Sequence, residues 1–194
     1  MKDVRHFLAV SRAAIAGSVL SICLMPAALA ASVEQQRADA WKMSQQTLER
    51  LYKAQPAARS VVQKAAGYAV FSAMGTKILL VGGGMGSGVA VDNRSGKPVY
   101  MKMAEAQAGL GLGVKKFHLV WVFENKKDLD TFINTGWELG GQASASAKLG
   151  SQGAAYTGAM SIKPGVWLYQ LIDDGLAAEL TAKGTRYYKD NDLN

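Results

Sequence analysis

Glycine recurs at every second position in two stretches of the chain, and this alternation restricts the possible folds more than any other feature. The glycines concerned are Gly82, Gly84, Gly86 and Gly88, followed by Gly109, Gly111 and Gly113. Because successive side chains of a strand point to opposite faces, each stretch predicts a strand with one face of bare backbone. Glycine inside a strand costs conformational entropy and contributes no packing, so something must lie close to that face.

Two kinds of neighbour fit such a face. Close packing of a helix, or of the opposite wall of a tightly curled sheet, is the favoured interpretation, because curled sheets use glycine at their bends. A ligand groove is the alternative. A phosphate-binding loop is not supported, because the run from Gly82 to Gly88 contains no G-x-G-x-x-G and the chain has no G-x-x-x-x-G-K-[S/T]. Small residues continue between Gly140 and Gly158, where alanines alternate with polar residues.

Local patterns predict the order of the elements. Residues Val33 to Gln55 lack Gly and Pro and carry apolar side chains at three- and four-residue spacings, which favours a helix. Pro56 ends it, and a second helix is expected from Ala57 to Ala66. Asn125 is a candidate N-cap for a helix at 126–135. A period of two predicts strands at 68–73, 77–91, 98–103, 106–123, 138–149, 154–162 and 166–172, with a hairpin at 173–175 leading into 176–180.

Consecutive strands with short turns indicate an antiparallel sheet, so the predicted class is α+β. We expect an N-terminal helical pair, residues 33–66, packed on a strongly curled, Gly-rich antiparallel β-sheet or partial barrel, residues 68–188, with one further helix at about 126–135. Residues 31–194 are predicted to form a single domain, since chains of about 150 residues bury a substantial core. The segment Asp190–Asn194 imitates the opening of a calcium loop without its later Gly and Glu, and we expect it to be solvated.

The first 30 residues have the pattern of a signal peptide. Three basic residues accompany an apolar stretch from Ala13 to Met25, and Ala28-Leu29-Ala30 supplies small residues for cleavage. The apolar stretch is shorter than the ~20 residues that a membrane-spanning helix needs. We therefore expect cleavage between Ala30 and Ala31 and a mature protein in the periplasm or the medium. The alternative is an outer-membrane lipoprotein acylated at Cys23.

Residues for several kinds of catalysis and metal binding are missing. His118 is the only histidine after the leader, and a lone histidine between Phe117 and Leu119 is more often structural than catalytic. The only cysteine is Cys23, and the chain has no G-x-S-x-G, H-E-x-x-H or C-x-x-C motif. We therefore predict neither an enzyme nor a bound metal or cofactor. A carboxylate-dependent hydrolase is the least favoured alternative.

The positive charge predicts attraction to anionic surfaces. Residues 1–30 carry three of the 22 basic and one of the 15 acidic residues, so their removal lowers the net charge from +7 to +5. Each Lys or Arg near anionic lipid contributes ~1 kcal/mol. Nucleic acid is not expected, because no aromatic and basic recognition motif accompanies the export pattern. The residues that we expect to bind lipid are Arg37, Trp41, Lys42, Arg50, Lys53, Arg94, Lys97, Lys115 and Lys116.

Five motifs follow one another in an order that is specific to one protein family. They are Lys64-Ala65-Ala66-Gly67-Tyr68-Ala69-Val70-Phe71, Val81-Gly82-Gly83-Gly84 with Gly86 and Gly88, Gly109-Leu110-Gly111-Leu112-Gly113, Phe132 before Trp137, and Gly184-Thr185-Arg186-Tyr187-Tyr188. Together they resemble the SYLF domain, whose family is also described as the yeast-type actin-binding domain family. The resemblance covers about Leu48 to Tyr188.

The resemblance implies a lipid-binding module. Eukaryotic SYLF members bind phosphoinositide membranes, with an N-terminal amphipathic helix contributing, and a fungal branch binds actin; bacterial relatives are exported proteins or lipoproteins. No SH3 or FYVE domain of the eukaryotic type is recognised here, and actin is not expected as a partner of an exported protein. We therefore predict a non-catalytic module that binds anionic phospholipid, phosphoinositide-like in relatives, at a membrane surface in the cell envelope. The alternative is a structural or envelope-assembly protein that docks a protein partner on its glycine-lined sheet face.

Overall fold

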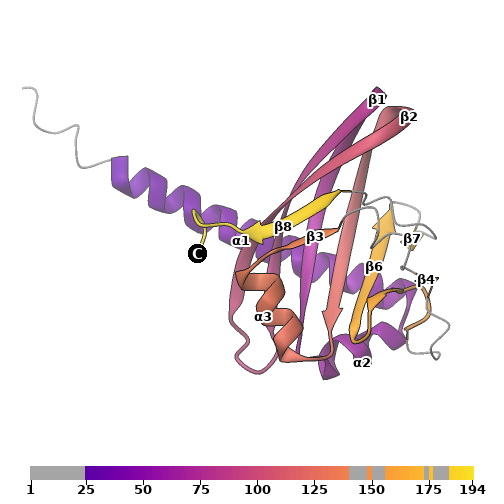
Figure 1. The fold of residues 1–194 in the computed structure, drawn as a ribbon. Coiled ribbons are helices and arrows are strands. Elements are labelled where there is room, and N and C mark those ends of the chain that lie inside the picture. Colours follow the sequence, from indigo (N-terminus) through magenta and orange to yellow (C-terminus); the bar gives the residue numbers. More distant parts are fainter. Residues whose placement is uncertain (1–24, 140–147, 150–155, 173–174, 177–183) are drawn as a thin grey trace, which may run out of the picture.

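The computed structural model describes residues 25–139, 148–149, 156–172, 175–176 and 184–194. These residues form three helices and an eight-stranded antiparallel sheet, so the predicted α+β class is confirmed (Figure 1). The helices are α1 (Met25–Ala54), α2 (Ala57–Lys64) and α3 (Lys126–Asn134). The strands are β1 (Gly67–Asp92), β2 (Pro98–Phe123), β3 (Trp137–Leu139), β4 (Lys148–Leu149), β5 (Met160–Lys163), β6 (Val166–Ile172), β7 (Gly175–Leu176) and β8 (Thr185–Lys189).

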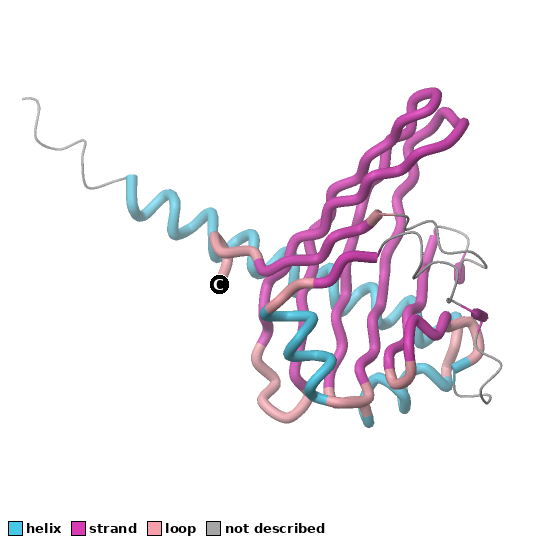
Figure 2. Tube along the Cα trace, in the orientation of Figure 1, coloured by secondary structure: helices cyan, strands magenta, loops and turns pink. Residues whose placement is uncertain are grey.

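Strands β1 and β2 form one long antiparallel hairpin, which we call the β ribbon. The pairing runs from Gly67 opposite Phe123 to Val91 opposite Pro98. The ribbon folds back on itself, because a side chain at Gly67 would collide with the Val91 carbonyl, and a Cβ on Gly84 would lie 3.2 Å from the Gly75 Cα. Both ends of the ribbon therefore meet at its base, and its bend lies at the opposite end (Figure 2).

The sequence predicted four strands where the structure has two. Pairing continues through Gly75, which lies opposite Lys115, and through Glu105, which lies opposite Gly84. The register shifts between Leu79 and Val81 at the bend. A shift of one residue exchanges the two faces of a strand. The inner face of β1 accordingly carries odd-numbered residues such as Phe71 and Ala73 before the bend, and even-numbered glycines and Ala90 after it.

The two halves of β2 belong to two walls of a partial barrel. Residues Met101–Glu105 pair with β8, whereas His118–Phe123 pair with β6. The resulting strand order is β3-β8-β2-β6-β5-β4, with β1 beside β2 and β7 beside β6. An aromatic core fills the space between the walls, where Trp121 packs against Phe123, Phe132 and Tyr187.

Helix α3 closes one side of this inner core. Asn125 caps the helix, because its side-chain oxygen accepts a hydrogen bond from the Asp128 N–H at 2.9 Å. Leu129, Phe132 and Ile133 lie on its buried face. Gly136 follows with a φ of 75°, which favours glycine. The helix predicted at 126–135 is therefore confirmed, and β6 has the predicted bounds.

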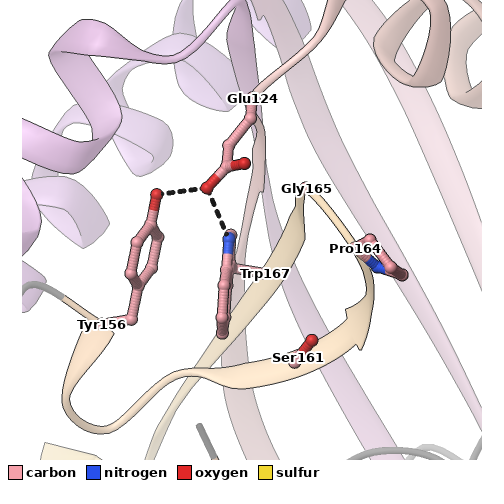
Figure 3. A pocket seen from close by; sticks show the side chains of 6 residues that line it. All are labelled: Glu124, Tyr156, Ser161, Pro164, Gly165 and Trp167. Carbon is pink, nitrogen blue, oxygen red and sulfur yellow. Dashed lines mark hydrogen bonds between the residues drawn. The ribbon is translucent and has the colours of Figure 1, made fainter. Parts of the chain in front are cut away.

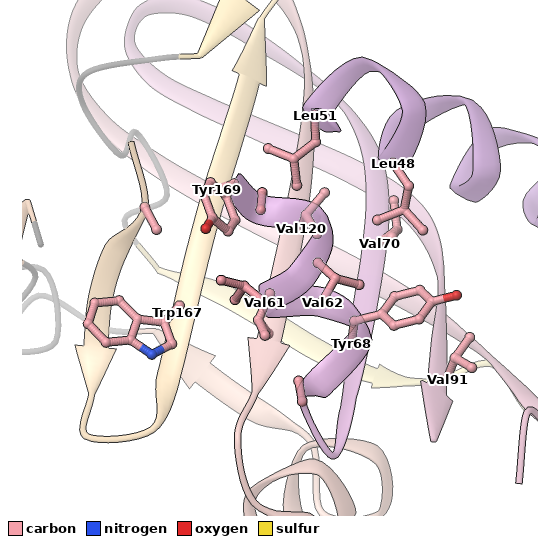
Figure 4. Close-up of a cluster of buried hydrophobic side chains, with 14 of the residues drawn as sticks. Leu48, Leu51, Val61, Val62, Tyr68, Val70, Val91, Val120, Trp167 and Tyr169 are labelled. Carbon is pink, nitrogen blue, oxygen red and sulfur yellow. The ribbon is translucent and has the colours of Figure 1, made fainter. Parts of the chain in front are cut away.

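A second core lies on the outer face of the sheet, under α1 and α2 (Figure 4). Burying each Val or Leu side chain contributes roughly 1.5–3 kcal/mol, so this apolar face holds the helical pair on the sheet. The labelled residues of Figure 4 come from both helices and from β1, β2 and β6: Leu48, Leu51, Val61, Val62, Tyr68, Val70, Val91, Val120, Trp167 and Tyr169.

Further predictions about the elements differ from the structure. Helix α1 begins at Met25 and not at Val33, and its N-terminal part extends beyond the sheet (Figure 1). Strand β8 was not predicted. Of the strand predicted at 138–149, β3 and β4 cover the two ends, and residues 140–147 lie outside the described part, as do 154–155 and 177–180 of the other predicted strands. The strand predicted at 154–162 is wrong at 156–159, which form a turn before β5 begins at Met160. The predicted hairpin at 173–175 is present as β6 paired with β7.

The prediction of a solvated C-terminal segment holds for Asn191, Asp192 and Asn194, which are exposed, and is wrong for Asp190 and Leu193. Asp190 and Leu193 are only 4% and 7% exposed. The Lys102 ammonium contacts the Asp190 carboxylate at 2.8 Å, and the Arg37 Nε donates a hydrogen bond to the Leu193 carbonyl at 2.8 Å. Asn194 Nδ2 donates to the Tyr100 carbonyl at 2.7 Å. The segment is held on the fold because residues far away in the sequence supply its charge and hydrogen-bond partners.

Candidate functional site

The glycine face of β1 is part of the interior. A Cβ on Gly86 would lie 2.6 Å from the Ser72 carbonyl oxygen, and one on Gly88 would lie 2.5 Å from the Val70 carbonyl oxygen. The other half of the same ribbon therefore covers these glycines, as the packing interpretation expected. At Gly86 and Gly88, neither a ligand nor a docked protein has room on this face. The surroundings of Gly109, Gly111 and Gly113 on β2 lie outside what the structure describes, so the partner-docking alternative stays a prediction there. Most of the small-residue stretch 140–158 lies outside the described residues.

The five lipid-binding residues expected on the first helix divide into two kinds. Trp41 is 36% exposed, and Lys42 and Lys53 are also exposed. Arg37 and Arg50 instead hold the fold together. Arg37 contacts the Leu193 carbonyl and Glu34, and Arg50 donates a hydrogen bond to the Ile172 carbonyl at 2.9 Å. Only the first three offer their polar groups to an outside partner.

The four other expected residues lie at opposite ends of the ribbon. Arg94 and Lys97 are exposed in the turn at its base. The Arg94 N–H donates a hydrogen bond to Asp92 at 2.8 Å, and this bond, together with Lys126, lowers the pKa of the Asp92 carboxyl. Lys115 and the exposed Lys116 lie on β2 toward the bend, opposite Gly75 and Met74. The nine predicted residues therefore occupy three places: helix α1, the base of the ribbon and its bend.

A pocket of about 370 Å³ opens beside the end of β2 (Figure 3). Glu124 is the central hydrogen-bond acceptor of this pocket. The Tyr156 hydroxyl and the Trp167 indole N–H both donate hydrogen bonds to the Glu124 Oε1, at 2.5 and 2.9 Å. The Tyr156 and Trp167 rings are stacked with their centroids 4.1 Å apart. Burial, followed by the contact with Glu124, raises the pKa of Tyr156. Ser161, Pro164 and Gly165 complete the lining.

This pocket has a structural use. Its hydrogen bonds join the end of β2, the turn at Tyr156 and strand β6, and the stacked rings fill the space between them. Its lining contains one carboxylate, one phenol and one serine hydroxyl, and the carboxylate is occupied by two donors. Sequence reasoning did not single out Glu124, because its partners lie 32 and 43 residues away.

Other chemistry is limited in the part of the chain that the structure describes. His118 lies with its Nδ1 3.3 Å from the Thr47 hydroxyl, so it joins β2 to α1. Among residues with described side chains, no three His, Cys, Asp or Glu gather where they could hold a metal ion. No helix in this same part is long and apolar enough to cross a membrane.

Comparisons with known proteins match this chain to a family model and to a curated relative. Residues 104–194 match a family model described as Las17-binding protein actin regulator. The chain is also 35% identical, over 153 residues, to Beta cell expansion factor A of Aeromonas veronii. That alignment covers 78% of this chain and 56% of the relative, so the chain spans about half the length of this curated relative.

Proposed function

Because this chain belongs to the SYLF domain family, we propose that it is a non-catalytic module that binds anionic phospholipid at a membrane surface of the cell envelope. SYLF domains form a family of binding modules associated with lipid and membranes. Family membership is the observation that carries the proposal. The export pattern of residues 1–30 supports an envelope location, in the periplasm or, through Cys23, as a lipoprotein.

Exposed residues of α1 support the same function. Tryptophan combines a large apolar ring with one N–H group, and such rings favour the interface between lipid and water. Trp41 and its neighbour Lys42 are both exposed, and Lys53 lies in the last turn of the helix. We propose that these three residues contribute to lipid binding. The exposed acidic residues Asp39 and Glu49 offset part of their attraction, so α1 supplies only a share of it.

Vesicle sedimentation tests the proposal. Protein purified from the cell envelope or the medium is mixed with anionic or with neutral phospholipid vesicles at low salt. We expect it to sediment with the anionic vesicles and to stay in solution with the neutral ones. Equal absence of binding to both vesicle types contradicts the proposal.

Charge reversal tests the share of α1. Replacing Lys42 and Lys53 together by Glu should weaken binding to anionic vesicles, because both side chains are exposed and each contributes attraction near anionic headgroups. Replacing Lys64 on α2 and Lys127 on α3 together by Glu, at positions that are also exposed, changes the net charge equally and is the matched control. If the control weakens binding as much as the change at Lys42 and Lys53, net charge alone governs the binding and α1 has no particular role.

A further inference from the structure

The bend of the β ribbon projects beyond the rest of the fold (Figures 1 and 2). Strand β8 pairs with β2 only at Met101–Glu105, and β6 pairs with it only at His118–Phe123. Between these two segments, β1 is the only described strand that pairs with β2. Isolated two-stranded hairpins are marginally stable in water, so a projecting ribbon gains from an additional contact.

Exposed apolar side chains lie on both sides of this bend. Met74 is 48% exposed and Met85 is 72% exposed, and Trp41 is the only other large hydrophobic residue exposed among the described side chains. Met74 lies opposite Lys116 and Met85 opposite Ala104, so one methionine belongs to each wall of the folded ribbon. Apolar surface of this kind marks a contact site.

The positive charge of the bend favours an anionic partner. No Asp or Glu occurs from Ser72 to Val91 or from Ala106 to Phe123, whereas the same segments contain Lys77, Lys115 and Lys116. Glu105, at the edge of this region, is only 5% exposed. A second copy of the chain would bring the same positive charges to the contact and be repelled. An anionic bilayer brings the opposite charge together with an apolar interior.

We propose that the ribbon bend enters the interfacial layer of an anionic bilayer, with Met74 and Met85 among the acyl chains and the exposed Lys116 at the headgroups. Lysine suits this arrangement because its stem packs against apolar groups while its ammonium stays in water. The entry is confined to the end of the ribbon between Met74 and Met85, since unpaired backbone groups at the outer edges of a two-stranded ribbon have no partners in hydrocarbon. This inference rests on the proposed function and names the surface that performs it.

A fluorescent probe at the bend tests the inference. Met85→Cys, in a Cys23→Ala background, is labelled with an environment-sensitive dye, and Ser60→Cys on the exposed surface of α2 is the matched control. With anionic vesicles, we expect the emission of the Met85 probe to shift to the blue and to be quenched by lipids with a shallow spin label. The Ser60 probe should keep its emission in water.

Sedimentation of the same samples separates the possible failures. Protein that sediments with vesicles while the Met85 probe is unchanged overturns the inference and leaves the proposed function standing. Protein that does not sediment with anionic vesicles overturns the proposed function and the inference with it. A blue shift that grows with protein concentration without vesicles means that a second copy covers the bend, which also overturns the inference.

Substitutions provide a second, independent test. Replacing Met74 and Met85 together by Asp should lower the affinity for anionic vesicles about tenfold or more. Replacing Ser60 and Gln63 of α2 together by Asp adds the same negative charge and should lower it less. All four side chains are exposed, and thermal unfolding of each variant checks that the fold is retained. Parental affinity in the folded variant of Met74 and Met85 overturns the inference. If that variant does not fold, the emission of the labelled Met85→Cys protein with anionic vesicles decides whether the bend enters the bilayer.

Discussion

Gly88 lies so close to Val70 that a Cβ added to it would come within 2.5 Å of the Val70 carbonyl oxygen. The two residues belong to the two halves of β1, on opposite sides of the bend. Stacked sheets with ordinary side chains lie ~10 Å apart, so the close approach of these halves depends on a face without side chains. The alternating glycines therefore act within the fold, where they allow the ribbon to close on itself.

Gly88→Ala should destabilise the protein strongly. The new methyl group would collide with the Val70 backbone and the Phe71 ring, and overpacking of this kind typically costs ~1–3 kcal/mol or more. Gly83→Ala is the matched control, because Gly83 is exposed and its added Cβ would lie 3.4 Å from the Glu105 carbonyl oxygen, an ordinary contact. Urea unfolding measures both changes. Equal stability of the two variants would show that the halves of β1 do not pack as described.

Lys102→Met should loosen the C-terminal segment. Lys102 contacts the buried Asp190 at 2.8 Å and the exposed Asp192 at 3.0 Å. Removing it leaves the Asp190 carboxylate buried without its cation, and because Lys102 is 38% exposed we expect a loss of ~1–2 kcal/mol in the free energy of unfolding. Asp192→Asn should cost less, since Asp192 is 83% exposed. A larger effect at Asp192 than at Lys102 is the contrary result.

Stability should fall between pH 10 and 12 in part because of Tyr169. Burial raises the pKa of Tyr169 to about 12, whereas tyrosine in an unfolded chain titrates near ~10. Below the pKa that Tyr169 has in the unfolded chain, both the folded and the unfolded protein hold the phenol proton, so the buried phenol contributes its full stabilisation. It is lost as the pH rises toward 12, since the unfolded chain releases this proton first.

Tyr169→Phe isolates this contribution. The phenylalanine variant should lose ~2 kcal/mol less stability than the parent between these pH values, as a shift of two pKa units implies. Denaturant unfolding at a series of pH values gives the comparison. Tyr52, whose pKa burial raises to about 12 as well, accounts for part of the loss that remains. Identical pH profiles for parent and variant would contradict this account of Tyr169.

Elements with local signals could be predicted from the sequence. Helix α3 has its cap at Asn125 and a glycine just past its end, and β6 is an apolar run between two turns. The two long strands could not be delimited in this way, because Gly75 and Glu105 stay in the sheet only through pairing partners 40 and 21 residues away. Strand β8 is short, and the burial of Tyr187 depends on contacts with Phe71 and Trp121.

The predicted lipid-binding residues separate for the same reason. Arg37 and Arg50 resemble other exposed cations in the sequence, yet their carbonyl partners lie 156 and 122 residues away. Lys116 lies near the bend as a consequence of strand register, which alternation alone does not fix. The exposure of Met74 and Met85 was not predicted, although the absence of acidic residues from Ser72 to Val91 was visible in the sequence.

The most direct test of lipid binding is the partition of the purified protein between buffer and vesicles as the anionic lipid content is raised at several salt concentrations. We predict that the bound fraction increases with anionic lipid and decreases with salt, because the exposed lysines act through charges that salt screens. Binding that is equal on neutral and anionic vesicles, or absent from both at low salt, would contradict the account.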